Sequence, residues 1–147
     1  MLTAVLALVV VSACSSSVKW SDSEEARFRQ RMAEVREATS AALLNATSGT
    51  KFGDDGIDFI ACDAPDVRLQ GTFIIDALVD PTQAEIESAV RSTWQGLGIK
   101  TERMRPRTIG VLGTDSSGLE VTVITVGSQR LTVTLTSPCR KDPSRGG

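Results

Sequence analysis

Apolar positions recur every three or four residues in two stretches of the chain, which predicts two amphipathic helices. The first is expected over residues 23–46, and Ser21 and Glu24 have the spacing of a capping box at its start. Arginine and glutamate are interleaved on its polar face, which predicts a solvated surface. The apolar stripe consists of Phe28, Met32, Val35, Thr39, Ala42 or Leu43, and Ala46.

The second helical stretch follows Asp80 and Pro81, an N-cap residue and a proline suited to the first helical turn. Its apolar stripe runs from Ala84 to Leu97 and includes Trp94. Glycines at 96 and 98 indicate where the helix stops. Trp94 is therefore expected in the core. Trp20 lies before the first helix, where periodicity does not explain it, and is a candidate recognition residue.

Strict alternation of apolar and polar residues dominates the last third of the chain. Leu131, Val133 and Leu135 alternate with threonines, which is typical of an antiparallel strand with one buried and one wet face. Gly-rich and Ser-rich turns separate this strand from its predecessors. Residues 47–66 are expected to form a loop with one short strand inside it. The predicted strands cover residues 57–62, 67–79, 108–112, 119–126 and 130–136.

These elements predict an α+β fold of one domain. The order is helix, strand, helix and then three strands, and 147 residues leave room for little more than one domain. We expect a two-layer sandwich in which an antiparallel sheet of about four strands carries both helices on one face.

The first residues of the chain have the pattern of an export signal. Residues 2–13 are uncharged and almost wholly apolar, and as a helix they would reach about 18 Å, too short for a bilayer core of about 30 Å. The run ends at Val11-Ser12-Ala13-Cys14, which resembles the lipobox of bacterial lipoproteins. That resemblance implies removal of residues 1–13 and acylation of Cys14. Ordinary secretion, with Cys14 left as a free thiol, is the alternative.

The expected organisation follows from that cleavage. Residues 14–22 form the lipidated N-terminus and a polar tether, residues 23–140 the α+β domain, and residues 141–147 a flexible tail. The domain is expected on the extracytoplasmic face of the membrane, where thiols oxidise. Cys62 and Cys139 are the two remaining cysteines, and they are expected to form a disulfide. Two buried free thiols are the alternative.

Composition narrows the classes of function. The net charge is −2, so the chain has no basic footprint for nucleic acid, and it contains no His. The motifs of Ser–Lys hydrolases, of nucleophile elbows and of phosphate loops are absent. We expect neither an enzyme nor a cofactor. A hydrolase that uses carboxylates such as Asp76 and Asp80 is the remaining enzymatic alternative.

Two charged stretches invite a chemical interpretation. Asp54, Asp55 and Asp58 are weak candidates for a metal site, because Ca²⁺ binds carboxylates in glycine-containing loops, but their spacing does not match a known calcium loop. An ordinary acidic loop is the expected outcome.

The second stretch is basic. Lys100, Arg103, Arg105 and Arg107 stand against the single acid Glu102. They are candidates for contact with anionic headgroups or with an anionic envelope polymer near the anchor. Ordinary surface charge is the alternative.

The layout resembles the small exported lipoproteins of actinobacteria. The resemblance rests on the lipobox, on Trp94-Gln-Gly-Leu-Gly98 at the end of the second helix, and on Ser137-Pro138-Cys139 after the last strand. Arg outnumbers Lys by 12 to 4, as in high-GC coding. The resemblance implies lipidation of Cys14 and no particular activity.

The sequence therefore predicts a membrane-anchored extracytoplasmic domain that acts by binding, as an accessory module of the envelope. A binder of small apolar ligands, with a pocket between sheet and helices, is the main alternative. A large exposed apolar patch over a filled core would favour a protein partner instead.

Overall fold

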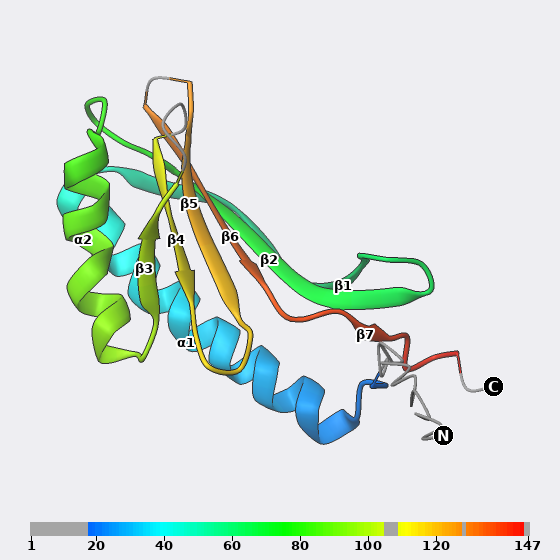
Figure 1. Cartoon of the computed structure of the whole chain (residues 1–147). Helices are drawn as coiled ribbons and strands as arrows, with labels where there is room; N and C mark the ends of the chain where they lie inside the picture. The colour runs from blue at the N-terminus through cyan, green and yellow to red at the C-terminus, as the bar shows by residue number, and fades with distance from the viewer. Residues whose placement is uncertain (1–17, 105–108, 128, 146–147) are drawn as a thin grey trace, which may run out of the picture.

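The computed structural model describes residues 18–104, 109–127 and 129–145, in which one antiparallel sheet is packed against two helices (Figure 1). The signal segment and Cys14 lie outside the described residues, as do Arg105 and Arg107. The elements, in chain order, are α1 (Asp22–Thr47), β1 (Thr50–Ala61), β2 (Asp66–Asp76), α2 (Gln83–Gly96), β3 (Lys100–Arg103), β4 (Gly110–Thr114), β5 (Glu120–Val126), β6 (Arg130–Thr136) and β7 (Arg140–Lys141).

The predicted sandwich with a sheet of about four strands is wrong. The described residues form a single sheet of seven strands, and the fold is mostly sheet. The largest difference from the prediction concerns β1, most of which is expected to be a loop because its glycines and aspartates have the composition of a loop. Charged residues are compatible with a strand at the edge of a sheet, which is where β1 lies. The strands β3 and β7 are too short, at four and two residues, to show a period.

The strand order is β1-β2-β6-β5-β4-β3, and β7 pairs with the first residues of β2. The central pair joins distant parts of the chain, with Phe73 of β2 opposite Val133 of β6. Glycine permits one close approach to the helices. A Cβ on Gly113 of β4 would lie 2.7 Å from the Trp94 ring and 2.6 Å from Ile99.

The core lies between the helices and one face of the sheet. Alternate residues of the central strands point to it, among them Phe73, Val123 and Val133, which are fully buried. From α1 the residues Met32, Val35 and Leu43 meet them, and α2 contributes Ile86, Val90 and Trp94. The prediction that Trp94 is a core residue is confirmed, and its indole Nε1–H donates to Thr39 Oγ1 at 2.9 Å.

The helix starts differ in part from the predicted caps. Ser21 accepts a hydrogen bond from the Glu24 amide, as predicted, while the Glu24 carboxylate pairs with Arg140 of β7 at 3.4 Å. The cap of α2 is Thr82, which forms a full capping box with Glu85. The prediction that Asp80 caps this helix is wrong, because α2 begins at Gln83, three residues further on.

The polar face of α1 is not simply solvated. Arg29 donates to the Ile57 carbonyl of β1, and Arg31 donates to the Leu97 carbonyl at the end of α2. Arg36 lies 2.9 Å from Asp54 of β1. These arginines therefore connect α1 to β1 and to the end of α2.

Asp115 organises the turn between β4 and β5. Its carboxylate accepts from the amides of Ser117 and Leu119 and from the Ser117 hydroxyl, and Arg31 of α1 donates to it at 3.3 Å. Burial of this carboxyl opposes its ionisation, but the hydrogen bonds outweigh burial, so the pKa of Asp115 is lowered.

Candidate functional site

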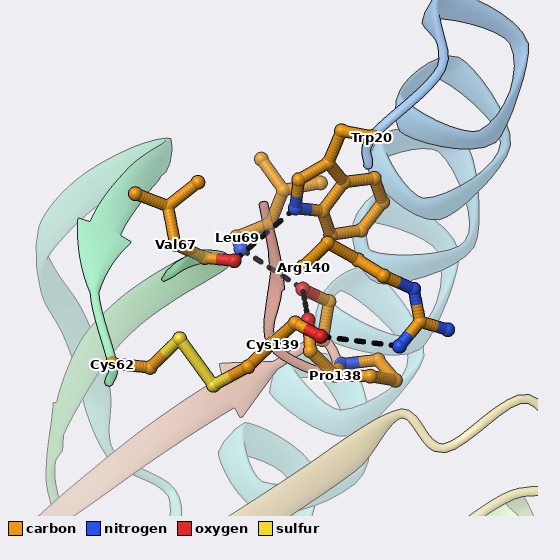
Figure 2. Close-up of a disulfide and its surroundings, with 8 residues drawn as sticks. Trp20, Cys62, Val67, Leu69, Pro138, Cys139 and Arg140 are labelled. Carbon is orange, nitrogen blue, oxygen red and sulfur yellow. Dashed lines mark hydrogen bonds between the residues drawn. A yellow bond between two sulfur atoms is a disulfide. The ribbon is translucent and has the colours of Figure 1, made fainter. Parts of the chain in front are cut away.

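The predicted Cys62–Cys139 disulfide is present, with its Cα atoms 6.2 Å apart (Figure 2). Cys62 follows the end of β1, and Cys139 directly precedes β7. Since β1 and β7 both pair with β2, the bridge joins the two strands that flank the start of β2. It closes a loop between residues 77 positions apart and ties the carboxyl-terminal strand to the body of the sheet.

Trp20 is buried, and its indole nitrogen points to the carbonyl of Val67, at the same end of the sheet as the bridge (Figure 2). Its indole Nε1–H donates to the Val67 carbonyl at 3.2 Å, and its ring packs edge-on against Phe28 and Phe59. Because Trp20 is 3% exposed and packs against residues of the fold itself, the interpretation of Trp20 as a recognition residue is wrong. It belongs to the core instead.

The residues just before α1 run along β7. The Lys141 amide donates to the Val18 carbonyl at 3.0 Å, and the Trp20 amide donates to the Lys141 carbonyl. Residues 18–20 and Lys141, assigned by the sequence to the tether and the tail, thus contact each other and the folded body. The chain enters the fold at the end of the sheet that carries β7 and the disulfide (Figure 1).

The weak metal candidates lie on β1 rather than in a loop. Asp54 is engaged by Arg36 and by Lys51, whose Nζ is 3.1 Å away. Among the described residues no group of three or more acidic or cysteine side chains is placed to hold a metal ion.

The basic stretch is divided by the fold. Lys100 is exposed on β3, whereas Arg103 on the same strand forms two hydrogen bonds to Glu87 of α2, at 3.2 and 2.8 Å. The hydrogen bond from Arg103 lowers the pKa of Glu87. Because Arg103 is engaged by this carboxylate, it contributes less positive charge to the surface than the sequence suggested. Arg105 and Arg107 lie outside the described residues.

The two carboxylates suggested for hydrolysis have different surroundings. Asp76, the last residue of β2, forms an ion pair with Arg130 at 3.0 Å. Asp80 lies in the exposed connection between β2 and α2.

The feature that sequence reasoning missed is a group of exposed apolar side chains, the apolar rim. Its members Leu78 and Val79 follow β2 and are 71% and 65% exposed. Val126 ends β5, Ile109 precedes β4, and Phe52 lies near the start of β1. The connection between β2 and α2 and the β5–β6 hairpin lie at the end of the sheet opposite to β7 (Figure 1).

Backbone contacts hold the rim together. The Leu78 amide donates to the Thr47 carbonyl at the end of α1, and the Ala77 amide donates to the Gln129 carbonyl of the hairpin at 2.7 Å. The Thr125 amide donates to the Ile109 carbonyl at 3.0 Å. The ends of α1 and β2, the starts of β1 and β4, and the β5–β6 hairpin are thus brought to one end of the molecule.

A small apolar hollow adjoins the rim between the end of α1 and the start of α2. Val79, Pro81, Leu43 and Ile86 contribute to its lining, and its volume is about 40 Å³. Pockets for small ligands have volumes of about 300 to 1,000 Å³, so this hollow holds a few water molecules at most. The larger hollows on the outer faces of α1 and α2 are open to solvent and shallow.

One signal in the sequence could have revealed the rim. The sequence pattern places Leu78 and Val79 in the strand predicted over residues 67–79, although Asp80 and Pro81, directly after them, are typical of a turn. The strand ends at Asp76 because pairing with Thr50 and Arg130 ends there.

Comparison with known proteins gives no relative. No protein-family model, no curated protein and no solved structure matches the chain. Within the described residues neither helix has both the length and the apolar composition to cross a membrane.

Proposed function

We propose that the protein is a lipid-anchored lipoprotein of the extracytoplasmic membrane face that binds an envelope protein through the apolar rim. The observation that carries the proposal is the position of the exposed apolar side chains. Six large hydrophobic residues of the described part are exposed, and five of them form the rim. The sixth, Val18, lies at the opposite end, where the chain arrives from Cys14.

Val18, the first described residue after Cys14, and the rim lie at opposite ends of the domain. Val18 is four positions after Cys14, so a lipid on Cys14 would hold the β7 end within about 13 Å of the headgroups at about 3.3 Å per residue. The 26 residues of α1 span about 39 Å between the two ends of the domain at about 1.5 Å per residue. The rim therefore faces away from the anchoring membrane.

A protein partner accounts for the rim better than a small ligand does. Among the described residues the core between sheet and helices contains closely packed apolar side chains, and the apolar hollow between α1 and α2 beside the rim is too small for a ligand. The larger hollow beside Val126 is open to solvent. Exposed apolar clusters on soluble domains mark contact with proteins or membranes. The charges nearest to Val126, those of Asp76 and Arg130, are paired with each other, so an apolar partner surface need not bury a lone charge.

The anchor is tested with the intact chain. Wild-type protein should incorporate a labelled fatty acid and partition into detergent, whereas Cys14→Ser should be unlabelled, because serine cannot form the thioether. An unlabelled wild type would contradict the proposed lipidation.

The rim is tested by substitution within the lipidated protein. Leu78→Glu should remove a partner that the wild type retains after cross-linking in the native envelope, because it places a charge in the apolar contact. Ala33→Glu, at an exposed position of α1 outside the rim, is the matched control and should retain the partner. If Leu78→Glu and wild type retain the same proteins, the rim is not the binding surface.

A further inference from the structure

The two edges of the sheet are built differently. The outer strand β1 has two register shifts along its pairing with β2 and a glycine at positive φ, Gly53, and it carries three aspartates. Bulges and charges of this kind prevent an edge strand from pairing with another chain. The strand at the other edge, β3, pairs with β4 in four consecutive steps without a shift. Among the described residues no strand pairs with the outer side of β3.

The hydrogen-bond pattern fixes which backbone groups of β3 face outward. The Met104 amide donates to the Gly110 carbonyl, in register with the pairing of β3 and β4. In an antiparallel pair, alternate residues direct their N–H and C=O groups to the same neighbour. Glu102 and Lys100 therefore bond toward β4, and the amides and carbonyls of Thr101 and Arg103 point to the open edge.

The side chains of β3 alternate between the two faces of the sheet. Arg103 lies on the face covered by α2, where it pairs with Glu87. Thr101 shares that face, because it is two residues away. Lys100 and Glu102 lie on the opposite face, and both are exposed. One positive and one negative side chain thus stand two residues apart beside an open edge.

We propose that β3 pairs antiparallel with β3 of a second copy of this chain, about a two-fold axis at Thr101. In this register the two Thr101 residues exchange backbone hydrogen bonds through their outward groups. Lys100 of each copy then lies directly opposite Glu102 of the other. Opposite charges at facing positions stabilise a strand pair, and the symmetry supplies two such pairs.

Neighbouring registers are disfavoured by charge. If the axis moves by one residue to Glu102, the two glutamates face each other. If it moves by one residue to Lys100, the two lysines do. Like charges directly opposite each other destabilise a strand pair. In the register at Thr101 the outward backbone groups of the two strands can form hydrogen bonds, and each Lys100 lies opposite a Glu102.

The face of α2 beside β3 leaves room for a second copy. Ala84 and Ser88 are small, exposed residues on the same open face as Arg91, which lies near Glu87. That face holds a shallow hollow that is open to solvent, and Ala84, Ser88 and Ser92 are the small residues in its lining. A second α2 can therefore approach across the two-fold axis.

The test uses two full-length chains that carry different carboxyl-terminal tags and are expressed together. Lys100→Glu places two acidic side chains on the edge, and Glu102→Lys places two basic ones there. Each variant should fail to co-purify with a differently tagged copy of itself, a loss of about tenfold or more relative to wild type. Lys100→Glu expressed with Glu102→Lys should restore co-purification, because every facing pair is again of opposite sign.

The restored pair distinguishes this proposal from misfolding, since both variants must fold to rescue each other. Glu37→Lys, at an exposed position of α1, is the control and should co-purify like wild type. Co-purification should also weaken with added salt, which screens exposed charges. If the mixed pair recovers no more than either variant alone, or if all combinations behave alike, pairing through β3 is overturned.

Discussion

Gly113 is the position at which one added methyl group tests the packing of the sheet against α2. Its Cβ would lie 2.6 Å from Ile99 Cγ2 and 2.7 Å from two ring carbons of Trp94. The ring cannot withdraw easily, because it is fully buried and its Nε1–H is bonded to Thr39. Relief requires a shift of several tenths of an ångström in side chains that are already close-packed.

The expected cost of Gly113→Ala is the difference between two effects. Overpacking of a filled core costs about 1 to 3 kcal/mol, and replacing glycine within a strand returns about 0.5 to 1 kcal/mol. The two ranges give a net destabilisation centred on about 1 kcal/mol and at most about 2.5 kcal/mol, and about 1 kcal/mol lowers the melting temperature by about 4 °C for a domain of this size.

Urea unfolding followed by tryptophan fluorescence measures the change. Gly96→Ala is the matched control, because it adds the same methyl group at the end of α2 with no atom within 4 Å. The control should be neutral or stabilised by up to about 1 kcal/mol. If Gly113→Ala is as stable as this control, the close approach of Trp94 to β4 is incorrect.

Three further predictions concern the interior and its fastenings. Thr39→Val should cost about 1 to 3 kcal/mol by leaving the Trp94 Nε1–H without an acceptor, and almost nothing in a Trp94→Phe background; equal costs in both backgrounds would exclude the hydrogen bond. Replacing Cys62 and Cys139 by serine should cost about 2 to 5 kcal/mol, and mass measurement after alkylation without reductant should find no free thiol at either position in the native exported protein. Asp115→Asn should be destabilising at neutral pH. Because the pKa of Asp115 is lowered in the folded protein, its ionised carboxylate stabilises the folded state at pH values above its unfolded pKa of about 3.9. The difference in stability between Asp115→Asn and wild type should therefore shrink as the pH falls below about 4. A constant difference in melting temperature from about pH 7 to about pH 3 would contradict this.

The strongly periodic elements could be predicted from the sequence. Alternation of apolar residues and threonines is strict over 130–136 and predicts a strand there, and β6 covers Arg130–Thr136. The helix expected over 23–46 is α1, Asp22–Thr47. Both elements have one buried and one open face, so their period records the direction of the core.

The strand order and the full extent of the sheet could not be predicted. β1 is an edge strand whose aspartates and glycines protect it from pairing, and this protection removes the pattern by which strands are recognised. The neighbour of β2 is set by the pairing of Phe73 with Val133, a contact that no local pattern encodes.

The apolar rim could not be predicted from the sequence for a related reason. Leu78 and Val79 are apolar and continue the sequence of a buried strand, so local pattern places them in the core. They are exposed because β2 ends where its pairing with two other strands ends, and those pairs come from distant segments.

The sequence also could not predict which charged side chains make contacts inside the fold. Interleaved arginines and glutamates on α1 indicated a solvated face, yet Arg31 reaches the Asp115 carboxylate, 84 residues away in sequence. Arg29 donates to the backbone of Ile57, which has no charge for a sequence pattern to detect. An arginine carries five donors on a long stem and can leave solvent wherever carbonyls and carboxylates converge, so its burial depends on tertiary contacts. The sequence gives the sign of each charged side chain. The charge that a partner encounters comes only from those side chains that are not paired within the fold. At the β3 edge, where Arg103 is held by Glu87, these side chains are Lys100 and Glu102.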